Sequence, residues 1–139
     1  MSKVSVATAN TAKEIVFSDF FTDFSRSPTS GMLNRKTNED AVKQSIRNLL
    51  LTDKYERPYQ PEIGSNIQAM LFENWTPALA EIMKNHVQNV FDNHEPRAEL
   101  INCVVHPTPD NATIIVKIYF RLINSEDTVE FDVILKRVR

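Results

Sequence analysis

The hydrophobic pattern changes its period once, close to Arg97, and this change limits the folds open to the chain. Before it, apolar residues recur every three or four positions within residues 39–52 and 77–94, which is typical of amphipathic helices. After it, apolar and polar residues alternate in three stretches within residues 100–135, which predicts half-buried strands. Helices followed by consecutive strands predict an α+β fold, in which an N-terminal arm and two to three helices pack on one face of a C-terminal three-stranded antiparallel meander.

The ends of the two long predicted helices carry start and stop signals. Thr37 or Asn38 can cap the first helix. Thr76 is a favourable cap for the second helix, and Pro77 follows at a position where its missing N–H group is harmless. Pro96 cannot continue that helix, so we expect it to end near His94.

The N-terminal part of the chain lacks a long periodic segment, so we predict an arm over residues 1–37 and a single α+β domain over residues 38–139. Four phenylalanines in the arm follow the spacing i, i+3, i+4, i+7, which is compatible with one or two helical turns. These residues are Phe17, Phe20, Phe21 and Phe24.

The composition excludes several classes of protein. A net charge of −2 argues against a nucleic-acid coat protein or a polybasic membrane binder. The two glycines, Gly31 and Gly64, are too few and too distant for a phosphate-binding loop. The one cysteine, Cys103, excludes an intrachain disulfide and alternates with Ile101 and Val105, so we expect all three to face the core.

The apolar runs are too short to cross a bilayer, and the N-terminus lacks the apolar region of a signal peptide. We therefore expect synthesis in the host cytoplasm, with neither nucleic acid nor membrane as a partner. The three histidines, His86, His94 and His106, do not have the spacing of a metal site, so no metal or cofactor is expected.

Catalytic signals are weak in this sequence. Glycoside hydrolysis needs a pair of carboxylates, and 18 acidic residues will always offer some pair. A cell-wall glycan hydrolase is kept as the alternative function, and Glu73 is the best candidate for its catalytic acid. The prediction is a protein that is not an enzyme.

A rigid corner is predicted between the last helix and the first strand of the meander. Pro96 stands between Glu95, whose carboxylate accepts hydrogen bonds, and Arg97, whose guanidinium group has five N–H donors. Such a corner can bind another protein with little ordering cost. The alternative is a capped helix end with an internal ion pair, and the residues alone leave both open.

Three segments in order resemble one known family. Residues 56–64, Glu-Arg-Pro-Tyr-Gln-Pro-Glu-Ile-Gly, resemble its Arg-Pro-aromatic-x-Pro-x-x-Gly segment. Residues 71–77 resemble its Leu-Phe-Glu-Asn segment, and residues 95–97 match its Glu-Pro-Arg motif. By this resemblance, over about residues 39–138, the chain is similar to the baseplate wedge and sheath-initiator family of contractile-tailed phages. Relatives occur in type VI secretion baseplates and phage-tail-like particles.

The resemblance implies a structural role in the virion tail baseplate. Its implied partners are other baseplate wedge proteins, the tail sheath subunit and the tail tube, with six copies around the tail axis. Glu95, Pro96 and Arg97 are implied to contact a helical bundle of wedge proteins. The last strand is implied to accept sheath strands along the residues Val129, Glu130, Phe131, Asp132, Val133, Ile134 and Leu135.

Two further alternatives come with the resemblance. Some members of the family carry a lysozyme label, which keeps the hydrolase alternative in view. The same assembly role in a type VI secretion machine or a phage-tail-like particle is equally compatible with these motifs.

Overall fold

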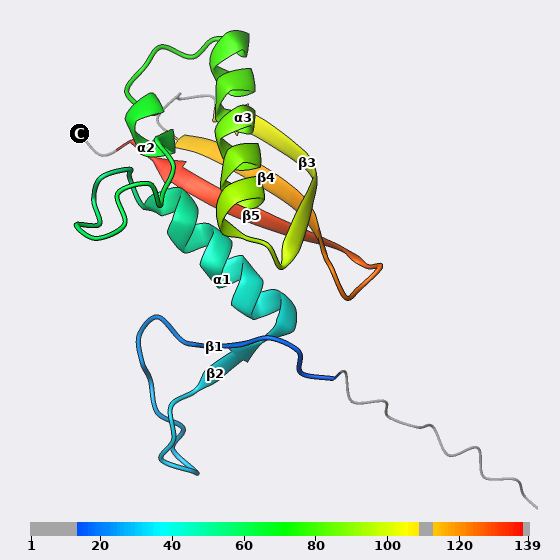
Figure 1. The fold of residues 1–139 in the computed structure, drawn as a ribbon. Coiled ribbons are helices and arrows are strands. Elements are labelled where there is room, and N and C mark those ends of the chain that lie inside the picture. The colour runs from blue at the N-terminus through cyan, green and yellow to red at the C-terminus, as the bar shows by residue number, and fades with distance from the viewer. Residues whose placement is uncertain (1–13, 109–112, 138–139) are drawn as a thin grey trace, which may run out of the picture.

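Three helices lie on one face of a three-stranded sheet in the computed structural model of the chain, which describes residues 14–108 and 113–137 (Figure 1). The helices are α1 (Asn38–Leu51), α2 (Ile67–Met70) and α3 (Pro77–His94). The sheet is an antiparallel meander in the order β3 (Ala98–Pro107), β4 (Thr113–Leu122) and β5 (Thr128–Lys136). A separate two-stranded sheet consists of β1 (Ser18–Phe20) and β2 (Arg35–Thr37). The predicted α+β fold is confirmed.

The two long helices begin in different ways. At α3 the Thr76 hydroxyl accepts a hydrogen bond from Leu79 N at 3.1 Å, so the predicted cap is confirmed. At α1 Thr37 occupies the cap position without a side-chain cap hydrogen bond. Asn38 does not cap the helix either, because its side-chain oxygen accepts from the backbone N–H groups of Val16 and Phe17. Of the two predicted candidates, Thr37 is thus the N-cap residue, although its side chain makes no cap hydrogen bond, and the Asn38 side chain binds the arm.

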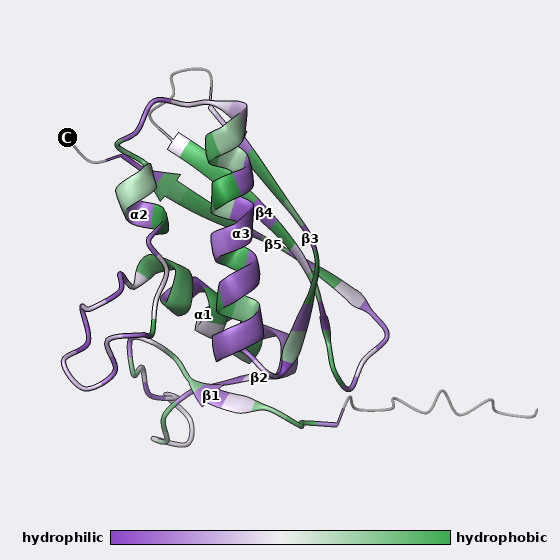
Figure 2. Cartoon of the chain, turned by 45° about the horizontal axis from the view of Figure 1, so that its top comes forward, coloured by the Kyte–Doolittle hydropathy of each residue, from purple (hydrophilic) through white to green (hydrophobic). Residues whose placement is uncertain are grey.

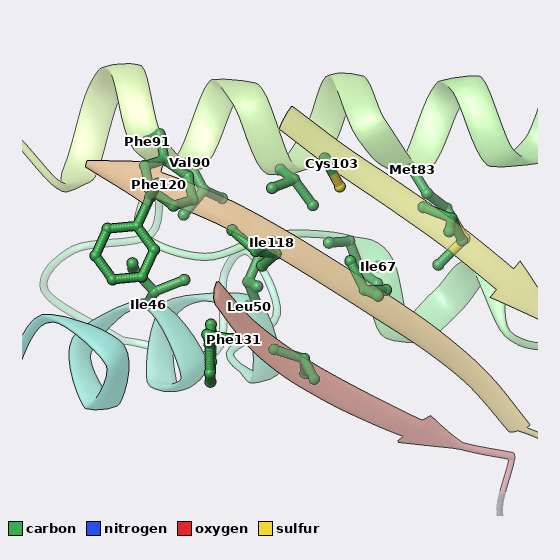
Figure 3. Packing of buried hydrophobic residues seen from close by; sticks show 14 of the residues in the cluster. Ile46, Leu50, Ile67, Met83, Val90, Phe91, Cys103, Ile118, Phe120 and Phe131 are labelled. Carbon is green, nitrogen blue, oxygen red and sulfur yellow. The ribbon is translucent and has the colours of Figure 1, made fainter. Parts of the chain in front are cut away.

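The core lies between the helices and the inner face of the meander. Figure 3 shows side chains from α1, α3 and the three strands converging there. Among them, the ring centroids of Phe91 and Phe120 lie 6.2 Å apart. Hydropathy colouring in Figure 2 shows the apolar residues of the strands and the mixed apolar and polar surface of α3. Burial of this apolar surface is the main driving force for folding.

The strand β3 departs from regular alternation at Ile101. Its pairing with β4 shifts between Leu100 and Asn102, which is a β-bulge. The extra residue shifts the alternation of inward and outward side chains by one position. Cys103 and Val105 are therefore buried, whereas Ile101 is 49% exposed. The expectation that all three face the core was wrong for Ile101. Burial raises the pKa of the Cys103 thiol to about 11, as expected for a packed, unreactive cysteine.

The strand β5 is regular over its whole length. Its residues pair with β4 without interruption from Lys136 opposite Thr113 to Thr128 opposite Arg121. Exposed and buried residues alternate strictly along it, as the sequence predicted. Within the described part of the chain, no strand pairs with its other side, so β5 is an edge strand.

The described part of the arm, residues 14–37, is a β-hairpin and not a helical segment. Ser18 pairs with Thr37 and Phe20 with Arg35 in antiparallel register, and β2 continues directly into α1 (Figure 1). The helical turns with which the phenylalanine spacing is compatible do not form, because pairing with β2 places β1 in an extended conformation. Residues 1–13 of the predicted arm lie outside the described residues.

Candidate partner-binding site

The corner between α3 and β3, residues Glu95–Arg97, is fixed by backbone hydrogen bonds at both ends. Glu95 N donates to Phe91 O at 3.2 Å, and Ala98 N donates to Glu95 O at 3.3 Å. Arg97 O accepts from Ile123 N at 3.1 Å, which ties the corner to the loop that follows β4. The stiff corner expected from Pro96 is therefore also tied to the sheet.

An internal ion pair occupies the centre of this corner. Arg97 Nε lies 2.6 Å from Glu95 Oε1, and Arg97 Nη2 donates to Glu95 Oε2 at 3.0 Å. The arrangement is the bidentate pairing that a guanidinium makes with a carboxylate. The hydrogen bonds to Glu95 raise the pKa of Arg97 above its ordinary value. Glu95 is only 1% exposed, so Arg97 neutralises a charge that would otherwise be buried alone.

The arm adds a third contact to Arg97. Asp19 of β1 accepts a hydrogen bond from Arg97 Nη1 at 3.3 Å, and the Phe17 ring centroid lies 5.7 Å from Arg97 Cζ. Asn38 N donates to Phe17 O at 2.8 Å, so the same segment is also held by the first residue of α1. Sequence reasoning missed Asp19, because 78 residues separate it from Arg97 and no local pattern marks the pair.

The corner thus combines features of both sequence-based interpretations. Its internal ion pair is present, and Glu95 is too buried to touch another molecule in this conformation. Pro96 is exposed, and the Arg97 side chain is 26% exposed. One N–H on each Nη atom of Arg97 has no acceptor among the described residues. Any direct contact from the corner would therefore be made by Pro96 and Arg97, with Glu95 holding Arg97 in place.

The edge of β5 is the second candidate site. The exposed outer face of this strand carries Glu130 and Asp132, whose carboxylates lie 3.6 and 3.9 Å from Lys117 Nζ of β4. The Tyr119 hydroxyl donates to Glu130 at 3.1 Å. These cross-strand contacts hold the charged side chains over the sheet face, and no strand among the described residues pairs with the outer backbone edge of β5.

The region around Glu73 does not resemble a hydrolase site. Glu73 is exposed and borders a small pocket of about 100 Å³. It is the only carboxylate among the described residues that line this pocket, whereas glycoside hydrolysis needs two. In the described ranges 14–108 and 113–137, no group of three or more His, Cys, Asp or Glu side chains is placed to hold a metal ion. The helices found in those ranges are all too short or too polar to span a bilayer.

An edge strand and a rigid corner are both features to which another protein chain can bind. Residues 36–127 match the profile of the family described as baseplate wedge protein gp25, and the chain belongs to this family. It is also 34% identical over 90 residues to the baseplate wedge protein gp25 of Enterobacteria phage T4, covering 65% of this chain and 68% of that protein. The family identified from the three motifs is confirmed. The hairpin strand β1, with Asp19, lies outside the matched residues.

Solved structures share the fold. A candidate tail lysozyme from Geobacter sulfurreducens superposes with a TM-score of 0.66 at 22% identity, covering 73% of this chain and 92% of that one. A chain of the anti-feeding prophage baseplate gives a TM-score of 0.61 at 21% identity, covering 88% of this chain and 87% of that one. A chain of the postcontracted pyocin R2 baseplate gives a TM-score of 0.52 at 21% identity, covering 78% of this chain and 95% of that one. At such identities the likeness shows the fold alone.

The family assignment makes the chain a structural baseplate component of a contractile phage tail or tail-like particle. The T4 relative is a baseplate wedge protein, which agrees with a structural role.

Proposed function

We propose that this chain docks on the helical bundle of the baseplate wedge through its Glu95–Arg97 corner and starts sheath assembly by accepting a sheath strand on β5. The proposal makes the chain an adaptor, which holds the wedge on one side and the first sheath ring on the other. It acts by binding and not by catalysis.

The observation that carries this proposal is the open edge of β5. An incoming strand forms main-chain hydrogen bonds along such an edge, and the alternating side chains select the partner. β5 supplies an uninterrupted ladder with β4, so its outer edge is straight over the segment Val129–Leu135. The opposite edge strand, β3, contains the bulge at Ile101, and bulges reduce the ability of an edge to pair. The asymmetry favours β5 as the acceptor.

The corner supports the wedge contact in a different way. Its side chains are held in one geometry before any partner arrives, so little conformational entropy is lost on binding. Arg97 has unused N–H groups that can reach acceptors on a neighbouring helix. Pro96 adds an exposed rigid apolar contact beside it.

The remaining parts of the proposal concern the assembled particle. Six copies surround the tail axis, close to the tail tube, after synthesis in the host cytoplasm. Repetition around a ring turns modest individual contacts into a strong assembly. The same function would apply in a phage tail, a phage-tail-like particle or a type VI secretion machine.

Site-specific photo-crosslinking tests the choice of edge. A photoreactive residue at Asp132 of β5 is compared with one at Val104 of β3, because both flank Lys117 in the same row of the sheet. We expect a crosslink to the sheath subunit from position 132 and none from position 104. Crosslinking from 104 alone, or from neither position in fully sheathed particles, would contradict strand addition at β5.

A further inference from the structure

The connector between α1 and α2 contains a closed loop that we call the tyrosine loop, residues 53–64. Its neck is sealed where Ser65 N donates to Thr52 O at 2.8 Å. Ser65 is buried, and its hydroxyl donates to Leu50 O at 2.7 Å. At Gly64 the two backbone segments of the neck come so close that a Cβ atom would lie 2.5 Å from Thr52 O. The loop therefore leaves the body of the protein at one tightly fixed place.

Inside the loop, further contacts restrict the chain. Tyr55 N donates to Pro61 O at 2.9 Å, which closes the loop on itself. Pro58 and Pro61 fix two more backbone angles. Tyr55 has a φ of 69°, a left-handed conformation that is uncommon and strained for a bulky residue. The surrounding hydrogen bonds thus maintain an unfavourable backbone geometry.

This restrained loop exposes its aromatic side chains to solvent. Tyr55 is 81% exposed and Tyr59 is 97% exposed. Neither ring contributes to the hydrophobic core of the described residues. Rigid, exposed tyrosines are the side chains that protein interfaces use as anchors, because they bury a large area at a low entropic cost.

The two tyrosines border a groove of about 800 Å³ between the loop and the last turn of α3. Figures 1 and 2 show the connector beside α3, and Asn93 and His94 form the opposite wall. His94 directly precedes Glu95, so this wall of the groove and the corner are consecutive in the chain. Two charged side chains, Lys54 and Glu62, also line the groove, and their opposite charges leave it without net charge.

We propose that the tyrosine loop is the second wall of the wedge-binding site, and that the groove takes the same wedge helix that the corner contacts. This inference rests on the proposed docking of the corner and extends it to a surface some 40 residues earlier in the chain. The occupant presents apolar side chains to the rings of Tyr55 and Tyr59. The corner orients it through Arg97. The continuity of groove and corner, the strain at Tyr55 and the exposed rings all point to one occupant.

The experiment measures binding of the full-length chain to the purified wedge subassembly of the same particle, prepared without this chain. The Tyr55→Ala/Tyr59→Ala variant is compared with Tyr55→Phe/Tyr59→Phe, which keeps both rings. We expect the alanine variant to bind at least tenfold more weakly and the phenylalanine variant to stay within about threefold of the parent. Because the groove has no net charge, the loss should be the same at low and high salt. Arg97→Lys, which keeps the positive charge but loses the planar five-donor guanidinium, reports separately on the corner contact.

The outcomes separate this inference from the proposed function. Unchanged binding of the alanine variant, with weakened binding of Arg97→Lys, overturns the role of the loop and leaves the corner contact standing. Unchanged binding of both variants overturns both proposals. Thermal unfolding of each variant is measured in parallel, and a lower midpoint for the alanine variant than for the phenylalanine variant would assign the tyrosines to the chain's own stability and contradict the inference.

Discussion

The tyrosine loop borders a groove whose opposite wall ends at His94, directly before the Glu95–Arg97 corner, and the two regions use their side chains in opposite ways. In the corner, the charged groups satisfy one another, and Glu95 is withdrawn from solvent. In the loop, the backbone hydrogen bonds are internal while the rings of Tyr55 and Tyr59 remain exposed. A rigid backbone can therefore carry either mutually paired or freely exposed side chains. The corner adds a side-chain ion pair to its backbone hydrogen bonds, whereas the loop is closed by backbone hydrogen bonds and leaves its two tyrosine rings free.

If the corner is held by its side chains, Arg97→Ala should cause the largest loss of stability. The substitution leaves Glu95 buried without its partner, which costs about 3–5 kcal/mol. Chemical denaturation measures this difference in the free energy of unfolding. As a control, Glu95→Leu/Arg97→Met removes both charges together, and we expect it to be less destabilising by about 2 kcal/mol. Equal losses in the two variants would show that the ion pair is not what holds the corner.

If the loop is held by its backbone, its neck should be sensitive to the smallest change. Gly64→Ala places a methyl group 2.5 Å from Thr52 O at a φ of 131°, so we expect a loss of about 2–3 kcal/mol. Gly31→Ala is the matched control, since Gly31 has a φ of 67° but nothing within 4 Å of the added atom. We expect about 1 kcal/mol there. Thermal unfolding of both variants would contradict this account if Gly31→Ala were the more damaging.

The contact of the arm with the corner should have the smallest effect. Asp19→Asn removes a charge from a pair whose side chains are 26% and 41% exposed, so we expect a loss of about 0.5 kcal/mol. Hydrogen exchange should nevertheless become faster in β1, because Arg97 no longer holds the strand as firmly. Asp23→Asn, a neutralised carboxylate in the same arm that does not contact Arg97, serves as the control. Identical exchange in both variants would show that Asp19 does not anchor the arm.

Much of the fold was predictable because its causes are local. Neighbouring residues determine the start of α3 at Thr76–Pro77 and the alternation of buried and more exposed residues in β4 and β5. The structure confirms both predictions. The bulge at Ile101 was not predictable, since the apolar alternation continues through it and only pairing with β4 reveals the extra residue.

The candidate site was predictable in its residues but not in its geometry. The Glu95–Arg97 ion pair was one of two open interpretations, and burial of Glu95 depends on how the whole sheet and helix pack around it. Asp19 could not be found, because its contact is formed only after the hairpin folds back onto the corner. Tyr59 was recognised as part of a motif, but its exposure follows from the closed loop that carries it.

The bulge in β3 has a consequence for how copies of the chain meet. A sheet with two straight borders can add further copies of itself on both sides and grow into an open-ended ribbon. Here one border is bent at Ile101 and the other runs straight along β5. Among the described residues, the bulge makes β3 the poorer edge for stacking of a second copy, and β5 is the more regular of the two edges.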